Sequence, residues 1–115
     1  MDTLTLLRER LARFADERDW NQFHNPKNLV MALSVEASEL MEHFQWMTPE
    51  EAAAPPSHIR DEMALEAADV LLYLIRLCDK LGIDLAAAAD NKLALNEHKY
   101  PVDKSRGRST KYDKL

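Results

Sequence analysis

Apolar residues recur at helical spacing along most of the chain, and this periodicity restricts the fold more than any other feature. Leu4, Leu7, Leu11 and Phe14 follow one another at the spacing of one face of an amphipathic helix. No segment shows the strict apolar–polar alternation that predicts a β-strand. Only two glycines occur among the 115 residues, which argues against a glycine-rich phosphate loop or a turn-rich β-sandwich. The sequence therefore predicts an all-α domain.

Helix-boundary residues divide this domain into four long segments. Asn25-Pro26 is typical of an N-cap followed by a first helical residue, and Asp84 is suited to cap a last helix. Thr48-Pro49-Glu50-Glu51 matches a capping box and predicts one short turn, after which Ser57 is the expected N-cap of a long helix that Gly82 ends. We expect a four-helix bundle-type fold with helices over about residues 3–18, 26–46, 58–81 and 84–100.

Charge is distributed unevenly along the chain. Lys and Arg number 15 and Asp and Glu 20, which gives a net charge of −5. Residues 101–115 hold five basic residues against two acidic ones, so this tail carries +3 and residues 1–100 carry −8. An acidic helical body argues against binding to nucleic acid. The tail is expected to be either a disordered solubilising segment or a basic arm that closes over an anionic ligand.

The chain shows no sequence sign of export or of a membrane span. Its first ten residues mix acids and bases without a long apolar core, unlike a signal peptide. The longest apolar run, Val70 to Ile75, is far shorter than the roughly 20 residues that a spanning helix needs. Cys78 is the only cysteine, so an internal disulfide is excluded and a reducing compartment is favoured. We expect a cytoplasmic protein without a membrane partner.

Two carboxylate pairs lie on the apolar faces of two predicted helices. At about 100° per residue, Glu36 and Glu39 fall in and beside one apolar stripe, and Glu66 and Asp69 take the equivalent positions on the other. If these stripes pack together, four carboxylates converge in one region. Burying each carboxylate without a partner costs several kcal/mol. Cations remove that cost, and an all-oxygen set favours Mg²⁺, with Mn²⁺ as the other candidate. The alternative is salt bridges to Lys or Arg of another element, whereas a ferritin-like di-iron site requires Glu-x-x-His pairs that the sequence lacks.

The aromatic residues occupy unusual positions. Trp20, Phe23 and His24 lie in the connector before the second helix, and Trp46 ends that helix. Stacking on a nucleobase is the functional interpretation and contributes about 1–3 kcal/mol per base. The alternative is that these rings fill the core between helix ends. Tyr73 lies beside the second carboxylate pair and either touches a ligand or lines the groove.

Taken in order, these motifs resemble the all-α nucleoside triphosphate pyrophosphohydrolases of MazG type, and most closely their dCTP-pyrophosphatase-like branch. The stretches that carry the resemblance are Arg18-Asp19-Trp20-x-x-Phe23-His24, Val35-Glu36-x-x-Glu39-Leu40, Phe44-Gln45-Trp46, Glu66-x-x-Asp69-Val70 and Lys92-x-x-x-Asn96-x-x-x-Tyr100-Pro101. Weaker similarity continues into residues 105–112. Residues 1–100 would then form the helical catalytic domain and residues 101–115 the tail.

The resemblance implies Mg²⁺-dependent hydrolysis of deoxynucleoside triphosphates to the monophosphate and pyrophosphate, with more than one ion and a house-cleaning role. It makes Glu36, Glu39, Glu66 and Asp69 the metal ligands. Glu39 is the candidate general base, unless a water activated by metal serves instead. The expected substrate contacts are Trp20, Phe23, His24, Trp46, Tyr73, Lys92, Asn96, Tyr100, Arg106 and Lys111. Three of these contacts lie four residues apart on one face of the last helix, namely Lys92, Asn96 and Tyr100. The alternative for them is that this face is simply solvated.

Two further expectations concern specificity and assembly. The resemblance favours substrates like dCTP. A broader range of dNTPs is also expected, because Leu11 stands where eukaryotic family members carry a His near the base pocket. The helix of residues 58–81 is apolar nearly all round, so one chain can hardly bury it. We expect a homo-oligomer, and the resemblance favours a tetramer. The alternative to an enzyme is an oligomeric helical interaction module with a structural ion among the carboxylates.

Overall fold

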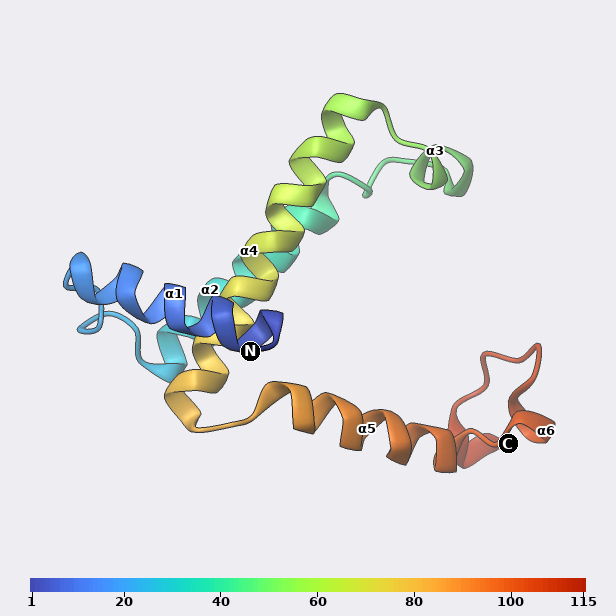
Figure 1. Ribbon diagram of the computed structural model, residues 1–115. Helices are drawn as coiled ribbons and strands as arrows, with labels where there is room; N and C mark the ends of the chain where they lie inside the picture. The colour runs from blue at the N-terminus through green and yellow to red at the C-terminus, as the bar shows by residue number, and fades with distance from the viewer. The chain divides into compact units, whose positions relative to one another are not determined.

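The computed structural model describes residues 1–115, and every regular element in it is helical. Figure 1 shows the order of the elements along the chain. The helices are α1 (Thr3–Glu17), α2 (Pro26–Glu42), α3 (Pro49–Ala53), α4 (Ser57–Leu81), α5 (Leu85–Lys99), α6 (Val102–Ser105) and the 3₁₀ helix η1 (Tyr112–Lys114). The predicted all-α class and its four long helices are confirmed. None of these helices combines the length and the apolar character that a membrane crossing requires.

Side-chain caps start most of the helices. The Asn25 carboxamide oxygen accepts a hydrogen bond from the backbone N–H of Asn28 at 2.9 Å, and Asp84 caps α5 in the same way. Thr48 and Glu51 form the predicted capping box of α3. The predicted N-cap at Ser57 is wrong: α4 begins at that residue, and Pro56 occupies the cap position without a side-chain hydrogen bond. The restricted φ of proline already sets the entry into the helix there.

Two helix ends differ in how well they were predicted. Gly82 ends α4 at a φ of 68°, and the N–H of Ile83 donates to the carbonyl of Cys78 at 2.8 Å, as in a Schellman motif. The second helix ends at Glu42, four residues before the predicted Trp46. Bonds over three residues tighten the chain after it, such as Phe44 N–H to the Met41 carbonyl at 2.9 Å. The Trp46 side chain is 87% exposed, so burial of this ring does not support a helix that continues to residue 46.

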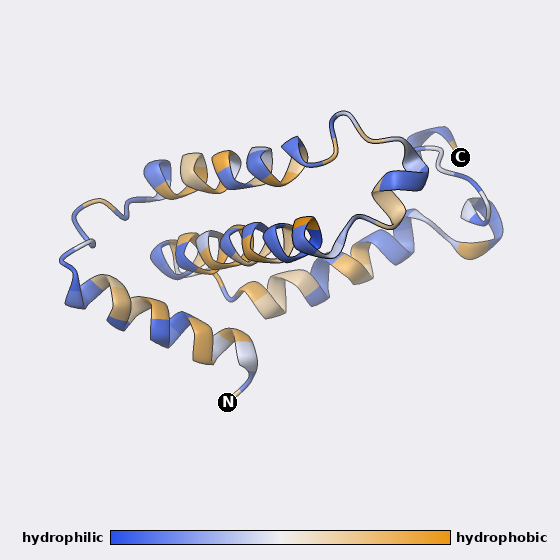
Figure 2. Cartoon of the chain, turned by 90° about the horizontal axis from the view of Figure 1, so that it is seen from above, coloured by the Kyte–Doolittle hydropathy of each residue, from blue (hydrophilic) through white to orange (hydrophobic).

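The chain divides into two compact units, Met1–Ile83 and Asp84–Leu115. In the first unit, α4 packs against both α1 and α2. The core between them contains Ala15, Leu29, Met63, Ile75 and Cys78. Figure 2 shows mixed hydrophilic and hydrophobic faces on each of these helices, as the apolar periodicity predicts for α1 and α2. The expectation that α4 is apolar nearly all round is wrong, because hydrophilic residues occur along its length.

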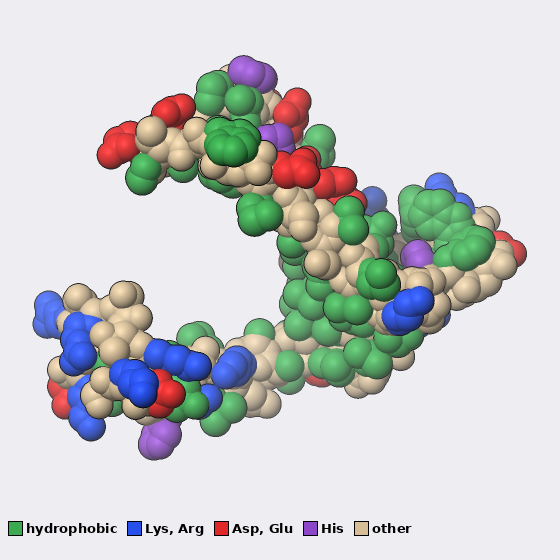
Figure 3. Space-filling model, turned by 180° about the vertical axis from the view of Figure 1, so that it is seen from behind, with side chains coloured by type: hydrophobic (Ala, Val, Ile, Leu, Met, Phe, Trp, Pro, Cys, Tyr) green, Lys and Arg blue, Asp and Glu red, His purple; other side chains and the backbone are tan.

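The second unit contains α5, α6 and η1, and no side chain in it is fully buried. Its C-terminal part folds back on the end of α5, where the Tyr112 and Tyr100 rings meet edge to face with centroids 6.0 Å apart. The Lys99 ammonium lies 4.7 Å from the Tyr112 ring centroid. Lys and Arg side chains gather on this unit (Figure 3). The division into a catalytic domain of residues 1–100 and a separate tail stays a prediction.

Candidate active site

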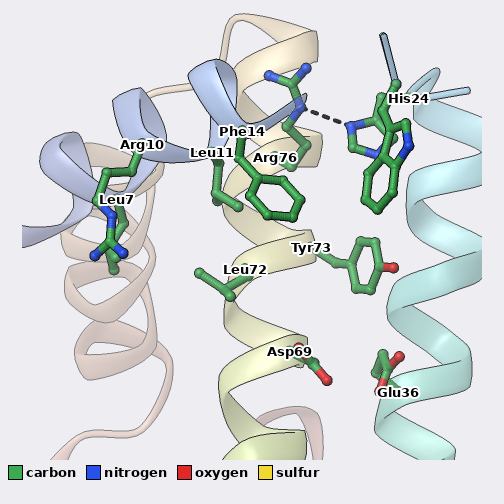
Figure 4. Close-up of a pocket in the computed structure, with 11 residues that line it drawn as sticks. Leu7, Arg10, Leu11, Phe14, His24, Glu36, Asp69, Leu72, Tyr73 and Arg76 are labelled. Carbon is green, nitrogen blue, oxygen red and sulfur yellow. Dashed lines mark hydrogen bonds between the residues drawn. The ribbon is translucent and has the colours of Figure 1, made fainter. Parts of the chain in front are cut away.

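A cavity of about 460 Å³ opens between α1, α2, α4 and the connector of residues 18–25. Carboxylates of Glu36 and Asp69 lie at one end, and His24 and Arg76 lie at the other (Figure 4). Most of the wall between the two ends is aliphatic or aromatic. The complete lining is Leu7, Arg10, Leu11, Phe14, Trp20, His24, Glu36, Asp69, Leu72, Tyr73 and Arg76. A mainly apolar cavity with a few polar groups is typical of a small-molecule site.

One face of α4 supplies a polar residue to the site on almost every turn. Glu66, Asp69, Tyr73 and Arg76 are spaced by three or four residues and therefore share a face. Across the gap, Glu36 of α2 lies opposite Asp69, and Tyr73 lies further along α4 toward His24 (Figure 4). The packing of α2 on α4 thus brings residues 30 or more positions apart in sequence to one cavity end.

Three of the predicted metal ligands act electrostatically on the fourth, Glu36. Burial raises the pKa of the Glu36 carboxyl, and further contributions come from its hydrogen bond with Glu39 and from the charges of Glu39, Asp69 and Glu66. Glu36 and Glu66 are half-buried, whereas Glu39 and Asp69 are exposed. No three Asp, Glu, His or Cys side chains are yet arranged around a common point as metal ligands. The carboxylates therefore share a region without forming a preassembled coordination shell.

Glu66 has a neighbour that the sequence analysis missed. Nε2 of His43 lies 2.6 Å from Oε2 of Glu66. This buried oxygen nevertheless accepts no hydrogen bond, so the contact lacks the alignment of one. His43 is four residues after Glu39 on α2, and this spacing could have indicated that it faces the same region.

The salt-bridge alternative for these carboxylates is not what the structure contains. Its Lys and Arg ion pairs join Arg18 to Glu17 and Arg76 to Asp79, whereas Glu66 is contacted by His43. No Lys or Arg pairs with any of the four predicted ligands. Their mutual repulsion is therefore left for another cation to neutralise, and an all-oxygen set with a buried, unsatisfied oxygen fits a hard divalent ion such as Mg²⁺.

The aromatic end of the cavity is built by α1 and the connector. The Phe14 and Trp20 rings meet edge to face at 5.5 Å, and the Trp20 and His24 rings at 6.0 Å. The backbone N–H of Trp20 donates to the Ala15 carbonyl at 2.9 Å. Asp19 takes a φ of 55°, a left-handed conformation that Asp tolerates better than most residues. This turn folds the connector back so that Trp20 and His24 face the cavity.

Other predicted contacts do not line this cavity. Phe23 is 57% exposed, and Trp46 lies in the turn after α2. Neither ring fills the core, so the core-filling alternative is wrong for both. Lys92, Asn96 and Tyr100 on α5, and Arg106 and Lys111 after it, belong to the C-terminal unit, and their part in substrate binding stays a prediction.

Arg76 is a polar cavity residue that the sequence analysis did not select, as is Arg10. Arg76 is only 5% exposed, its Nε donates to Nδ1 of His24 at 3.1 Å, and its guanidinium also donates to the Asn21 carboxamide oxygen. Burial lowers the pKa of His24, and the charges of Arg76 and Lys80 lower it further. Helical spacing could have indicated that Arg76 lies on the face of α4 that carries the other site residues, because the spacing continues from Glu66 through Asp69 and Tyr73 to Arg76.

Comparison with known proteins gives consistent matches. The chain is 44% identical over 116 residues to dCTP pyrophosphatase 1 of Mus musculus, which covers 98% of this chain and 68% of the mouse protein. The protein of the same name from Homo sapiens is 43% identical over 115 residues, with the same coverage. A solved pyrophosphatase structure from Archaeoglobus fulgidus aligns with a TM-score of 0.82 and 38% identity, over 88% of this chain and 94% of that one. The MazG-like family profile matches residues 31–115. The chain therefore belongs to the MazG-like family.

Proposed function

We propose that this protein hydrolyses deoxynucleoside triphosphates to the monophosphate and pyrophosphate, with substrates like dCTP favoured. The observation that carries the proposal is one cavity that has carboxylates at one end and aromatic rings at the other. A nucleotide fits this arrangement once cations neutralise the carboxylates, because its phosphates are anionic and its base is flat and largely apolar on its faces. Membership of the MazG-like family and similarity to proteins named dCTP pyrophosphatase 1 support the same reaction.

The carboxylate end is the proposed site of Mg²⁺. Glu36, Glu39, Glu66 and Asp69 would hold more than one ion, and Mn²⁺ is the other candidate. Bound Mg²⁺ would supply positive charge that neutralises the triphosphate and the charge that develops during hydrolysis. The closeness of the four carboxylates to one another supports this assignment, as does the absence of Lys and Arg partners for them.

The protein side chains would orient the reactants and accept a proton. A water oxygen bonds to the α-phosphorus while the bond from that phosphorus to the bridging oxygen breaks, which releases pyrophosphate. Glu39 is the proposed acceptor of the water proton, since its side chain is exposed and adjoins Glu36. Trp20 and His24 are proposed to contact the base, and Tyr73 to contact the sugar between the two ends of the cavity.

The remaining predicted contacts belong to the same proposal. Phe23 and Trp46 present exposed rings that a ligand or a second chain would cover. The basic residues after α5 suit the phosphates of the substrate, and the tail is proposed to close over them. The residues concerned on this unit are Lys92, Asn96, Tyr100, Arg106 and Lys111.

We also propose that the working protein is a homo-oligomer, most simply a tetramer, in the cytoplasm. Large apolar side chains of α2 and α4 remain exposed, among them Met31, Val35 and Leu65, the last at 70%. Hydrophobic side chains are visible over much of the surface of the first unit (Figure 3). Burying them against further copies would remove this apolar area from water. The free, buried thiol of Cys78 suits a reducing compartment.

The test is product analysis with purified protein, dCTP and Mg²⁺, using ion-exchange separation. The proposal expects dCMP and pyrophosphate in equal amounts. Glu39→Gln should reduce turnover by at least a hundredfold while the circular dichroism spectrum stays helical. Glu42→Gln, a neutralised exposed carboxylate on the same helix, is the matched control and should retain activity. Formation of dCDP and orthophosphate would refute the proposed reaction.

A further inference from the structure

Arg76 ties α4 to the connector that carries the aromatic end of the cavity. Its side chain is buried, yet its charge and N–H groups have partners. Nε donates to Nδ1 of His24 at 3.1 Å, the guanidinium donates to Asn21, and Nη1 lies 3.5 Å from the Asp79 carboxylate. A buried guanidinium with these partners is held in one orientation.

The bond to Arg76 determines which nitrogen of His24 carries the proton. A guanidinium can only donate hydrogen bonds, so Nδ1 of His24 must be the acceptor. In a neutral imidazole the proton then resides on Nε2. The lowered pKa of His24, which burial and the charges of Arg76 and Lys80 produce, keeps the ring neutral at pH 7.

The Nε2–H group of His24 remains available to a ligand. It makes no hydrogen bond within the protein, and it is not among the buried unsatisfied atoms. His24 lines the cavity (Figure 4), and the ring centroid of Trp20, another lining residue, is 6.0 Å from that of His24. The aromatic end therefore presents one N–H donor beside a stacking surface.

We propose that Arg76 is a positioning residue that fixes His24 as an Nε2–H donor, so that this end of the cavity selects a base with a hydrogen-bond acceptor. The identification of the ligand as a nucleotide rests on the proposed function. A pyrimidine such as cytosine offers acceptors on its pairing edge. A base that presents only donors at this point would leave the N–H unsatisfied and bind less well.

The tautomer can be measured directly by NMR on protein with ¹⁵N-labelled histidine, at pH 7 and without substrate. His24→Gln identifies the His24 resonances among those of the four histidines. The proposal expects an unprotonated Nδ1 and a protonated Nε2 in the wild-type protein. Arg76→Met should abolish this single tautomer. The control Lys80→Met should keep it, because Lys80 bonds to Asn21 and acts on His24 only through its charge, without a hydrogen bond to either ring nitrogen. A wild-type proton on Nδ1, or an unchanged spectrum in Arg76→Met, would overturn the proposal.

Kinetics then tests whether Arg76 acts through His24. Arg76→Met should raise the KM for dCTP about tenfold, with kcat changed less than about twofold. In a His24→Leu background the same substitution should raise KM no further. An equal increase in both backgrounds would show that Arg76 does not act by positioning His24. A wild-type protein without turnover would refute the proposed function instead, and the NMR result would still decide the tautomer.

Discussion

Glu36→Gln is expected to stabilise the protein in the absence of metal. Burial and the neighbouring charges of Glu39, Asp69 and Glu66 raise the pKa of the Glu36 carboxyl. A raised pKa means that folding disfavours the ionised form of this carboxyl. Glutamine keeps the shape of the side chain and removes the charge, so it removes this unfavourable contribution.

The size of the effect follows from the number of like-charged neighbours. Three carboxylates act on Glu36, and a like-charged neighbour on a partly exposed helical surface costs about 0.3 kcal/mol. Together they give about 1 kcal/mol, which corresponds to an increase in melting temperature of roughly 4 °C for a domain of this size. The same substitution should weaken stabilisation by Mg²⁺, because one proposed ligand loses its charge.

Thermal unfolding followed by circular dichroism provides the assay, in EDTA and in 5 mM Mg²⁺. Glu42→Gln is the control, because this exposed carboxylate lies on the same helix but does not act on Glu36. We expect Glu36→Gln to melt above wild type in EDTA and to gain less than wild type from Mg²⁺. An unchanged or lower melting temperature in EDTA, or an equal gain from Mg²⁺, would refute the account of the carboxylate cluster.

Three further predictions concern the core and its titratable groups. Leu29→Ala should cost about 3 kcal/mol in urea unfolding, because Leu29 is only 1% exposed; a loss below 1 kcal/mol would contradict its place in the core. Because the pKa of His24 is lowered in the folded protein, the unfolded chain binds a proton at higher pH than the folded chain does. The free energy of unfolding of wild type should therefore fall as pH drops below the ordinary pKa of 6.5, and His24→Gln should show a shallower fall. An equal slope in both proteins would contradict the lowered pKa. Burial raises the pKa of the Cys78 thiol. A thiol-reactive chromophore should therefore label Cys78 slowly in native protein and quickly in urea. Rapid labelling of the native protein would argue against burial of this thiol.

Local signals predicted most of the helical boundaries. Asn25, Thr48 and Asp84 act on backbone N–H groups within three residues, so their roles can be inferred from sequence alone. The end of α2 could not be predicted in this way. Apolar periodicity continues past Glu42, but the helix stops there: the following residues form turns with hydrogen bonds over three residues, and Trp46 stays exposed. Whether such a turn is extended depends on packing against residues far away in the sequence.

The same distinction applies to the candidate site. Helical spacing predicted that Glu36 and Asp69 would face one region, and the packing of α2 on α4 brings them to the same cavity. Arg76 lies on the same face, but a surface Arg would look identical in the sequence. Its partners His24 and Asn21 are more than 50 residues away, so only the tertiary fold reveals that it is buried and paired.

Hydrolysis of dCTP in H₂¹⁸O tests the central claim most directly, because it reports which phosphorus water attacks. Each dCTP molecule is hydrolysed once and takes up one oxygen from the labelled water. The products are separated, and the ¹⁸O content of each is measured by mass spectrometry. Attack at the α-phosphorus, which the account predicts, places one ¹⁸O in dCMP and none in pyrophosphate. Label in pyrophosphate, or label in orthophosphate released together with dCDP, would contradict it.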